Sequence, residues 1–226
     1  MPASDIDNQQ SFGSATADAS PIDLSYTVSA VESNLALCVF ARLQTVGGNL
    51  SGVSATYNGV AMTTGYGTAD QAGSFFLFAY LLSPASGTHT ISISYTTTSA
   101  NAAYVVSAFT VTNTTGLRDS DTATGSSATS LSMPALSGVV ASDMCVMGVG
   151  LRNGTGDQDI TFGSGQTQIH DLHINAGSGF FADLGTSYEL GETTLTAAWT
   201  NSSVAHSAWC GAFINATGGS GFWAFF

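Results

Sequence analysis

The stretch GTHTISISYTT, residues 87–97, alternates apolar and polar side chains between Ile91 and Tyr95. Alternation with a period of two is typical of a β-strand that has one face in a core and the other in water. The runs LALCVFARL (35–43) and SFFLFAYLL (74–82) are apolar on both faces, as expected of central strands. Helix-forming Glu, Lys, Gln and Arg are scarce, and Gly, Ser and Thr interrupt every window, so the sequence predicts an all-β protein.

An internal repeat extends this pattern along the chain. One match sets NLALCVFARLQ beside SDMCVMGVGLR, with Cys38 opposite Cys145. Another sets GTHTISISYTT beside GETTLTAAWTN, pairing Ile91 with Leu195 and Tyr95 with Trp199. The other matches join SATADAS (14–20) to DTATGSS (121–127), SFFLFAYLL to GFFADLGTS (179–187) through a Phe pair, and AYVVSAFTVTNTTG (103–116) to AHSAWCGAFINATG (205–218). The offsets stay between 102 and 107 residues, so we expect the same order of strands in both halves.

The repeat also predicts the domain organisation. A lone five-stranded sheet would leave one apolar face bare, so the two half-repeats, residues 22–116 and 128–217, are expected to pack face to face. The expected fold is one antiparallel β-sandwich of about ten strands, jelly-roll-like, with pseudo-two-fold symmetry. Residues 1–21 are expected to form an N-terminal arm, and residues 218–226 a Gly-rich spacer with an aromatic C-terminal tail. Two separate domains are the alternative, but the joining segment, 116–130, is short for a domain linker.

Charged side chains are sparse and mostly acidic. They make up 8% of the residues, against about 25% in ordinary soluble domains. The net charge is −12, and the only basic side chains are Arg42, Arg118 and Arg152. A nucleic-acid binder needs clustered Lys and Arg to neutralise phosphates, and binding to an anionic membrane surface requires the same kind of basic cluster. Both classes of partner are therefore excluded.

Targeting signals and a disulfide framework are also not predicted. No apolar run approaches the ~18 residues of a membrane helix, and the first twenty residues have neither a basic nor an apolar region of a signal peptide. We therefore expect a protein made in the cytoplasm. The three cysteines, Cys38, Cys145 and Cys210, are an odd number and lie in apolar runs, so buried free thiols are expected.

The strand motifs resemble a known module. The segment YNGVAMT (57–63), the aromatic strand before SPASGT (83–88) and the turn GQTQ (165–168) are similar to those of a β-sandwich module common in bacterial surface proteins and tailed-phage virion proteins. The resemblance covers about residues 22–216. Its motifs are structural, so it implies the fold and a structural or binding role, and it implies no catalytic residues.

The sequence spacing of the candidate metal ligands gives little support for a metal site. His170 and His173 would point to opposite faces of a strand, and a zinc site would need two further ligands. Asn153, Asp157 and Asp159 lie in a Gly-rich loop that offers oxygen ligands to calcium, but their spacing matches no EF-hand. Acidic turns are common for solubility alone, and we expect no metal or other cofactor.

An enzyme is not predicted either. The chain has no G-x-S-x-G, no lysine for Schiff-base chemistry, no phosphate-binding loop and only three glutamates. Aromatic side chains on strands, namely Tyr57, Tyr66, Trp199 and Trp209, offer a stacking surface for sugars. Core packing is the alternative for these four, and the equivalence of Tyr95 and Trp199 in the repeat favours it.

The aromatic tail is the strongest functional feature of the sequence. Gly218, Gly219, Ser220 and Gly221 form a flexible spacer, followed by FWAFF. Each ring buries roughly 150–250 Å² when it packs against another surface. We expect Phe222, Trp223, Phe225 and Phe226 to be assembly contacts with a neighbouring subunit or partner. Folding back onto the chain's own sandwich is the alternative.

These features predict a non-enzymatic structural protein of a tailed-phage virion. Capsid decoration or a head or tail appendage is the expected role, with capsid or tail proteins of the same virion as partners and a homo-oligomer as the expected state. The alternatives are an extracellular adhesin or carbohydrate-binding module, and a surface-filament subunit in which a terminal strand completes a neighbour's sheet.

Overall fold

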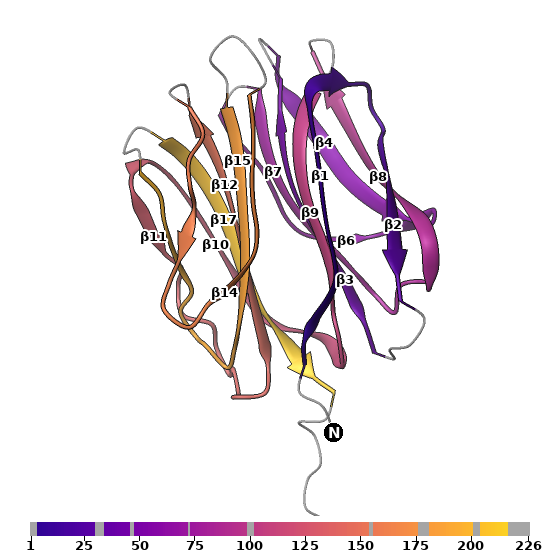
Figure 1. The fold of residues 1–226 in the computed structure, drawn as a ribbon, viewed down its shortest axis with the longest axis vertical. Helices are drawn as coiled ribbons and strands as arrows, with labels where there is room; N and C mark the ends of the chain where they lie inside the picture. Colours follow the sequence, from indigo (N-terminus) through magenta and orange to yellow (C-terminus); the bar gives the residue numbers. More distant parts are fainter. Residues whose placement is uncertain are drawn as a thin grey trace, which may run out of the picture.

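The computed structural model is all-β (Figure 1). It describes residues 4–29, 34–45, 48–71, 73–98, 102–153, 156–175, 181–200 and 204–216. The strands form four antiparallel sheets, none of them closed into a barrel. The predicted fold class, an all-β sandwich, is confirmed.

The first half of the chain forms one five-stranded and one four-stranded sheet. The five-stranded sheet has the order β1-β9-β3-β7-β6, with β1 Ile6–Asp18, β9 Ala102–Val111, β3 Ala36–Gln44, β7 Ser74–Leu82 and β6 Thr63–Gln71. The four-stranded sheet has the order β2-β8-β4-β5, with β2 Ile22–Val28, β8 Gly87–Thr97, β4 Leu50–Tyr57 and β5 Val60–Ala61.

The second half repeats this arrangement. Its five-stranded sheet has the order β10-β17-β12-β15-β14, with β10 Thr114–Ala128, β17 Val204–Asn215, β12 Met144–Asn153, β15 Phe181–Leu190 and β14 Thr167–Asn175. Its smaller sheet has the order β11-β16-β13, with β11 Ser130–Ser132, β16 Thr196–Ala198 and β13 Thr161–Phe162.

The two halves share one strand order, which confirms the repeat. In each half the chain alternates between two sheets, so that β1-β9-β3-β7 and β2-β8-β4-β5 form a jelly roll. Side-chain details repeat as well. The Tyr95 hydroxyl donates a hydrogen bond to the carbonyl of Asp18, the last residue of β1. Equivalently, the Trp199 indole N–H donates to the carbonyl of Ala128, the last residue of β10, at 2.8 Å.

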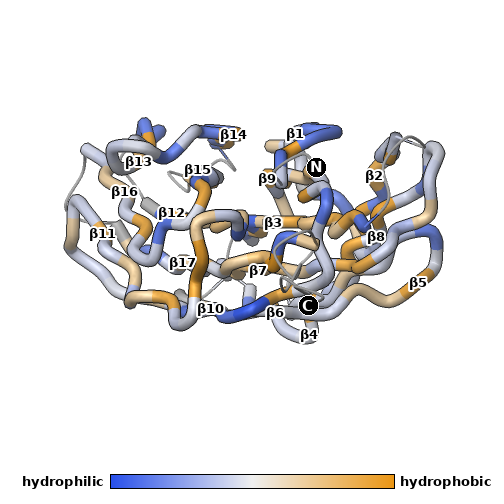
Figure 2. The backbone as a smooth tube through the Cα atoms, turned by 90° about the horizontal axis from the view of Figure 1, so that it is seen from below, coloured by the Kyte–Doolittle hydropathy of each residue, from blue (hydrophilic) through white to orange (hydrophobic). Residues whose placement is uncertain are grey.

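The chain forms four layers rather than the expected two (Figure 2). The five-stranded sheets face each other in the middle, as predicted, but each also carries a smaller sheet on its outer face. The described residues accordingly form three hydrophobic cores: one inside each half, and a third between the two central sheets. We call this third core the seam.

Burial patterns explain the two kinds of layer. Strands β3 and β9 are buried at every position, so both of their faces must be covered. Strand β2 is buried at every second position and covers a central sheet with its one apolar face. The prediction of two layers did not account for the outer faces of the central sheets. A central sheet that is apolar on both faces needs a covering layer on each side.

Glycines in the second half receive aromatic rings of the first half at the seam. A Cβ added to Gly148 of β12 would overlap the ring of Phe40 on β3. A Cβ on Gly150 would lie 2.6 Å from the ring of Phe76 on β7. Without these two glycines the central sheets could not approach as closely as they do.

Two segments expected to lie mostly outside the two half-repeats are edge strands of the sandwich. Residues 6–18 of the expected N-terminal arm form β1, which pairs with β9 from Ile6 to Asp18. Most of the expected joining segment, 116–130, belongs to β10, which pairs with β17. Both strands are rich in Ser, Thr, Asp and Gly because most of their side chains are exposed or half-buried, so their hydrophobic signal is weak.

The predicted pairing of residues across the repeat needs a correction of register. Cys38 and Cys145 lie on equivalent strands, and Ile91 and Leu195 are both buried in the cores of their halves, as expected. However, Val111 and Phe213, which are equivalent in the repeat, pair with Ala36 and Met144 respectively. Ala36 therefore corresponds to Met144, so Cys38, two residues further on, corresponds to Val146 and not to Cys145. Cys38 therefore faces the seam and Cys145 faces its own half's core. The Phe-pair match is also displaced, by three residues.

Candidate functional site

The predicted assembly contacts Phe222, Trp223, Phe225 and Phe226 lie outside the described residues, so their role stays a prediction. The structure does define the position of Ala216, the last described residue before that segment. Residue Ala216 follows β17, and its backbone N–H donates to the carbonyl of Asn113 at 2.7 Å. This point lies at the end of the molecule where β9 finishes and β10 begins.

Asp143 organises this end of the molecule. Its carboxylate pairs with Arg118, with Nε–Oδ2 at 2.6 Å and Nη2–Oδ1 at 3.2 Å. The same carboxylate accepts hydrogen bonds from the backbone N–H of Val140 at 3.0 Å and of Asn215 at 3.3 Å. Burial opposes ionisation of Asp143, but the hydrogen bond from Arg118 and those from the backbone outweigh it, so its pKa is lowered.

The two termini of the fold meet beside this carboxylate. The Asn215 amide donates to Ser4 Oγ at 3.0 Å, and the Asn113 amide donates to the Asn215 side-chain oxygen at 3.4 Å. Sequence reasoning did not single out Arg118 or Asp143. The two residues lie 25 positions apart, and no motif in the sequence links them.

Exposed aliphatic side chains gather at the same end. Among the described residues, four large hydrophobic side chains are exposed: Val60, Leu82, Val140 and Leu190. Leu190 is paired with Met144, which pairs in turn with Phe213 of β17. Leu82 lies next to Gly116, which pairs with Ile214. Leu82, Val140 and Leu190, which we call the end patch, therefore lie around the last residues of β17.

The two histidines considered as metal ligands point to opposite faces, as predicted. His170 Nδ1 lies 2.8 Å from Ser107 Oγ, which lies 2.9 Å from Thr186 Oγ1, so this contact joins the two halves. Burial lowers the pKa of His170. His173 Nε2 faces the other side and lies 3.5 Å from Asp157 Oδ2.

Acidic residues near His173 include the buried Asp183. Burial, together with the nearby charges of Asp157 and Asp171, raises its pKa to about 7. The backbone N–H of Gln158 donates to its carboxylate at 3.1 Å. Within the described ranges, no three His, Cys, Asp or Glu side chains come close enough to hold a metal ion.

The other residues considered above are mostly buried in the cores. Tyr57, Trp199 and Trp209 are buried, and Tyr66 packs against the seam, so these side chains do not form a stacking surface for sugars. Cys38, Cys145 and Cys210 are free and buried, as predicted. Burial raises the pKa of the Cys145 and Cys210 thiols to about 12.

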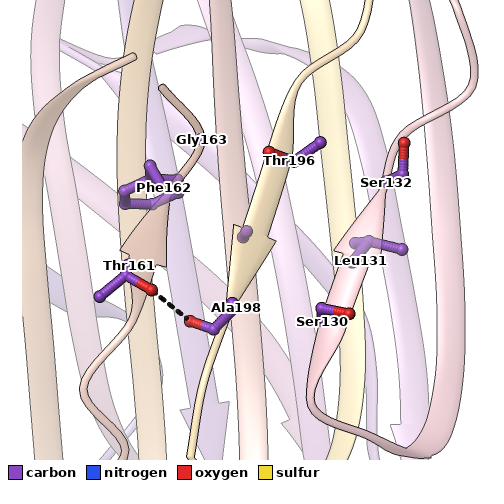
Figure 3. Close-up of a pocket in the computed structure, with 9 residues that line it drawn as sticks. Ser130, Leu131, Ser132, Thr161, Phe162, Gly163, Thr196 and Ala198 are labelled. Atoms are coloured by element: carbon purple, nitrogen blue, oxygen red, sulfur yellow. Dashed lines mark hydrogen bonds between the residues drawn. The ribbon is translucent and has the colours of Figure 1, made fainter. Parts of the chain in front are cut away.

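A shallow depression of about 300 Å³ lies over the three-stranded sheet β11-β16-β13 (Figure 3). Its surface is formed by Ser130, Leu131, Ser132, Thr161, Phe162, Gly163, Thr196, Ala197 and Ala198. The Thr161 hydroxyl donates to the Ala198 carbonyl at 3.3 Å. Its described lining offers hydroxyl and backbone groups and no ionisable side chain, so it supports weak hydrogen bonding rather than acid–base chemistry.

The chain matches no family model, and no curated protein and no solved structure is significantly similar to it. In the part of the chain that the structure describes, no helix is long and apolar enough to cross a membrane.

Proposed function

We propose that this protein is a non-enzymatic structural component of a tailed-phage virion, acting as a capsid decoration protein or a head or tail appendage. The observation that carries the proposal is the fusion of two jelly rolls through the seam. Jelly rolls are common building blocks of viral capsids. Here Phe40 and Phe76 of one half fit against glycines of the other, so the two halves form one block.

The polar surface of the protein is also suited to this role. Ser and Thr replace Lys and Glu on the solvent-facing positions of strands such as β2 and β8, and the net charge is −12. An acidic protein repels nucleic acid and other polyanions, which favours a place on the outside of a particle. The aromatic tail would supply the contact with neighbours, through burial of its rings.

Purified native particles provide the test. Mass spectrometry of gradient-purified virions should detect the protein at a constant ratio to the major capsid or tail protein. Antibody labelling in negative-stain images should then place it on the head or tail. If the protein is absent from particles and the pure protein binds glycans on an array, the carbohydrate-binding alternative is correct instead.

A further inference from the structure

We propose that the end patch is the docking surface for the aromatic tail of a second copy of this chain, so that two copies associate end to end. This inference rests on the proposed function in assigning the tail to assembly, and it names the receiving surface and the partner.

The position of the end patch is the first argument. Leu82, Val140 and Leu190 are exposed by 41%, 45% and 44%. They surround the end of β17 through the contacts of Gly116 with Leu82, of Asp143 with Val140 and Asn215, and of Met144 with Leu190. Each half supplies at least one of them. The aromatic residues follow Ala216 in the sequence, so the tail begins at the same end of the molecule as the end patch.

Reach is the second argument. Residues 217–221 separate Ala216 from Phe222. Five residues span at most about 18 Å when extended. When two copies meet end to end, their β17 termini and their end patches face each other. Each tail then needs to cross only the gap between the two ends.

The apolar area that has to be covered favours docking between two copies over docking of the tail on its own chain. The three aliphatic side chains together leave on the order of 200 Å² of apolar surface exposed. Four aromatic rings bring roughly 600–1,000 Å². One patch is too small to cover one tail. Two tails bring roughly 1,200–2,000 Å², which is the size of a specific interface, when their rings pack on each other as well as on the two patches.

Such an interface is self-complementary. The same surface is used on both copies, which is the arrangement of a two-fold dimer. The partly exposed Arg118 guanidinium, which is paired with Asp143, lies at the edge of this surface. It would place a cation next to the aromatic rings in the dimer, a contact that stabilises desolvated aromatic groups.

Sedimentation velocity of the full-length protein over a range of micromolar concentrations tests the proposal. We expect a reversible dimer. Leu82→Ser with Leu190→Ser should raise the dimer dissociation constant by roughly tenfold or more, and so should Phe222→Ser with Trp223→Ser. Val60→Ser is the matched control, because Val60 is 53% exposed on β5, in the outer sheet of the first half, and should leave the constant unchanged.

A mixing experiment separates a second copy from the chain's own tail. A chain truncated after Ala216 keeps the patch, and the Leu82→Ser, Leu190→Ser chain keeps the tail. Each alone should be monomeric, and the mixture should form a heterodimer that is weaker than the wild-type dimer, because it has one tail and one patch instead of two of each. The proposal is overturned if the wild-type protein stays monomeric, or if the patch variant dimerises like the wild type. A monomer whose truncation increases the binding of a hydrophobic dye would show that the tail covers its own patch. Because these measurements need no virion, a protein that dimerises yet is absent from particles would refute only the proposed function.

Discussion

Phe78 of β7 and Trp209 of β17 stack across the seam, with their ring centroids 3.7 Å apart and their planes inclined by 19°. Phe40 joins them, at 4.6 Å from Phe78 and 5.9 Å from Trp209. Both rings of the stack are fully buried. This contact joins residues 131 positions apart in the sequence and makes the two jelly rolls one unit.

The Phe78–Trp209 stack should show energetic coupling. Trp209→Ala should lower the free energy of unfolding by about 3–5 kcal/mol, since a large buried ring is lost. A double-mutant cycle with Phe78→Ala, measured by urea denaturation, should give a coupling energy of about 0.5–1.5 kcal/mol or more. Strictly additive effects would mean that the two halves are stabilised independently of this contact.

Gly148 should tolerate no side chain. Gly148→Ala places a methyl group into the ring of Phe40, so we expect a loss of about 1–3 kcal/mol in the free energy of unfolding. Gly13→Ala is the matched control, because an added Cβ there makes ordinary contacts from 3.4 Å outwards. Equal effects of the two substitutions in urea denaturation would show that the seam is not tightly packed at Gly148.

Asp183 should make the protein less stable as the pH rises. Its pKa is about 7 in the fold against 3.8 as the ordinary value, so between these values the folded state binds more protons than the unfolded state. The wild type should therefore lose stability relative to Asp183→Asn from about pH 4 to pH 7, by at most about 4 kcal/mol, with no further change above. Unfolding of both proteins across this pH range measures it, with the exposed Asp159→Asn as control. A difference that does not vary with pH would contradict the raised pKa.

All three thiols should be protected in the folded protein. Cys38, Cys145 and Cys210 are buried, and burial raises the pKa of each thiol, so little thiolate is present at neutral pH. A thiol reagent should react slowly with the native protein and should count three thiols per chain after denaturation without reductant. A count of one would reveal a disulfide.

The aromatic tail should matter for assembly and not for folding. Deleting residues 219–226 should leave a folded monomer with little change in melting temperature, because we expect the tail to contact a neighbouring copy rather than the cores of its own chain. The same deletion should abolish incorporation into particles, which co-sedimentation with virions would measure. A destabilised monomer that still assembles would place the tail in the chain's own core.

The amino-acid sequence by itself determined the strands and their repetition. Alternation in residues 91–95 and continuous apolar runs such as 35–43 depend only on which side chains avoid water, so they could be recognised without a structure. The buried free cysteines and the opposite orientation of His170 and His173 followed from the same local rules. The polar edge strands β1 and β10 were not predicted as strands of the sheets, because most of their side chains are exposed or half-buried and give a weak hydrophobic signal.

Tertiary structure alone decided how the repeated halves combine. Whether Cys38 faces the seam or its own half depends on a one-residue register, and a shift of one residue moves every side chain to the other face. The fit of Phe40 at Gly148, the Arg118–Asp143 pair and the end patch bring together residues far apart in the chain. Such contacts are set by the packing of one sheet on another, which has no period in the sequence.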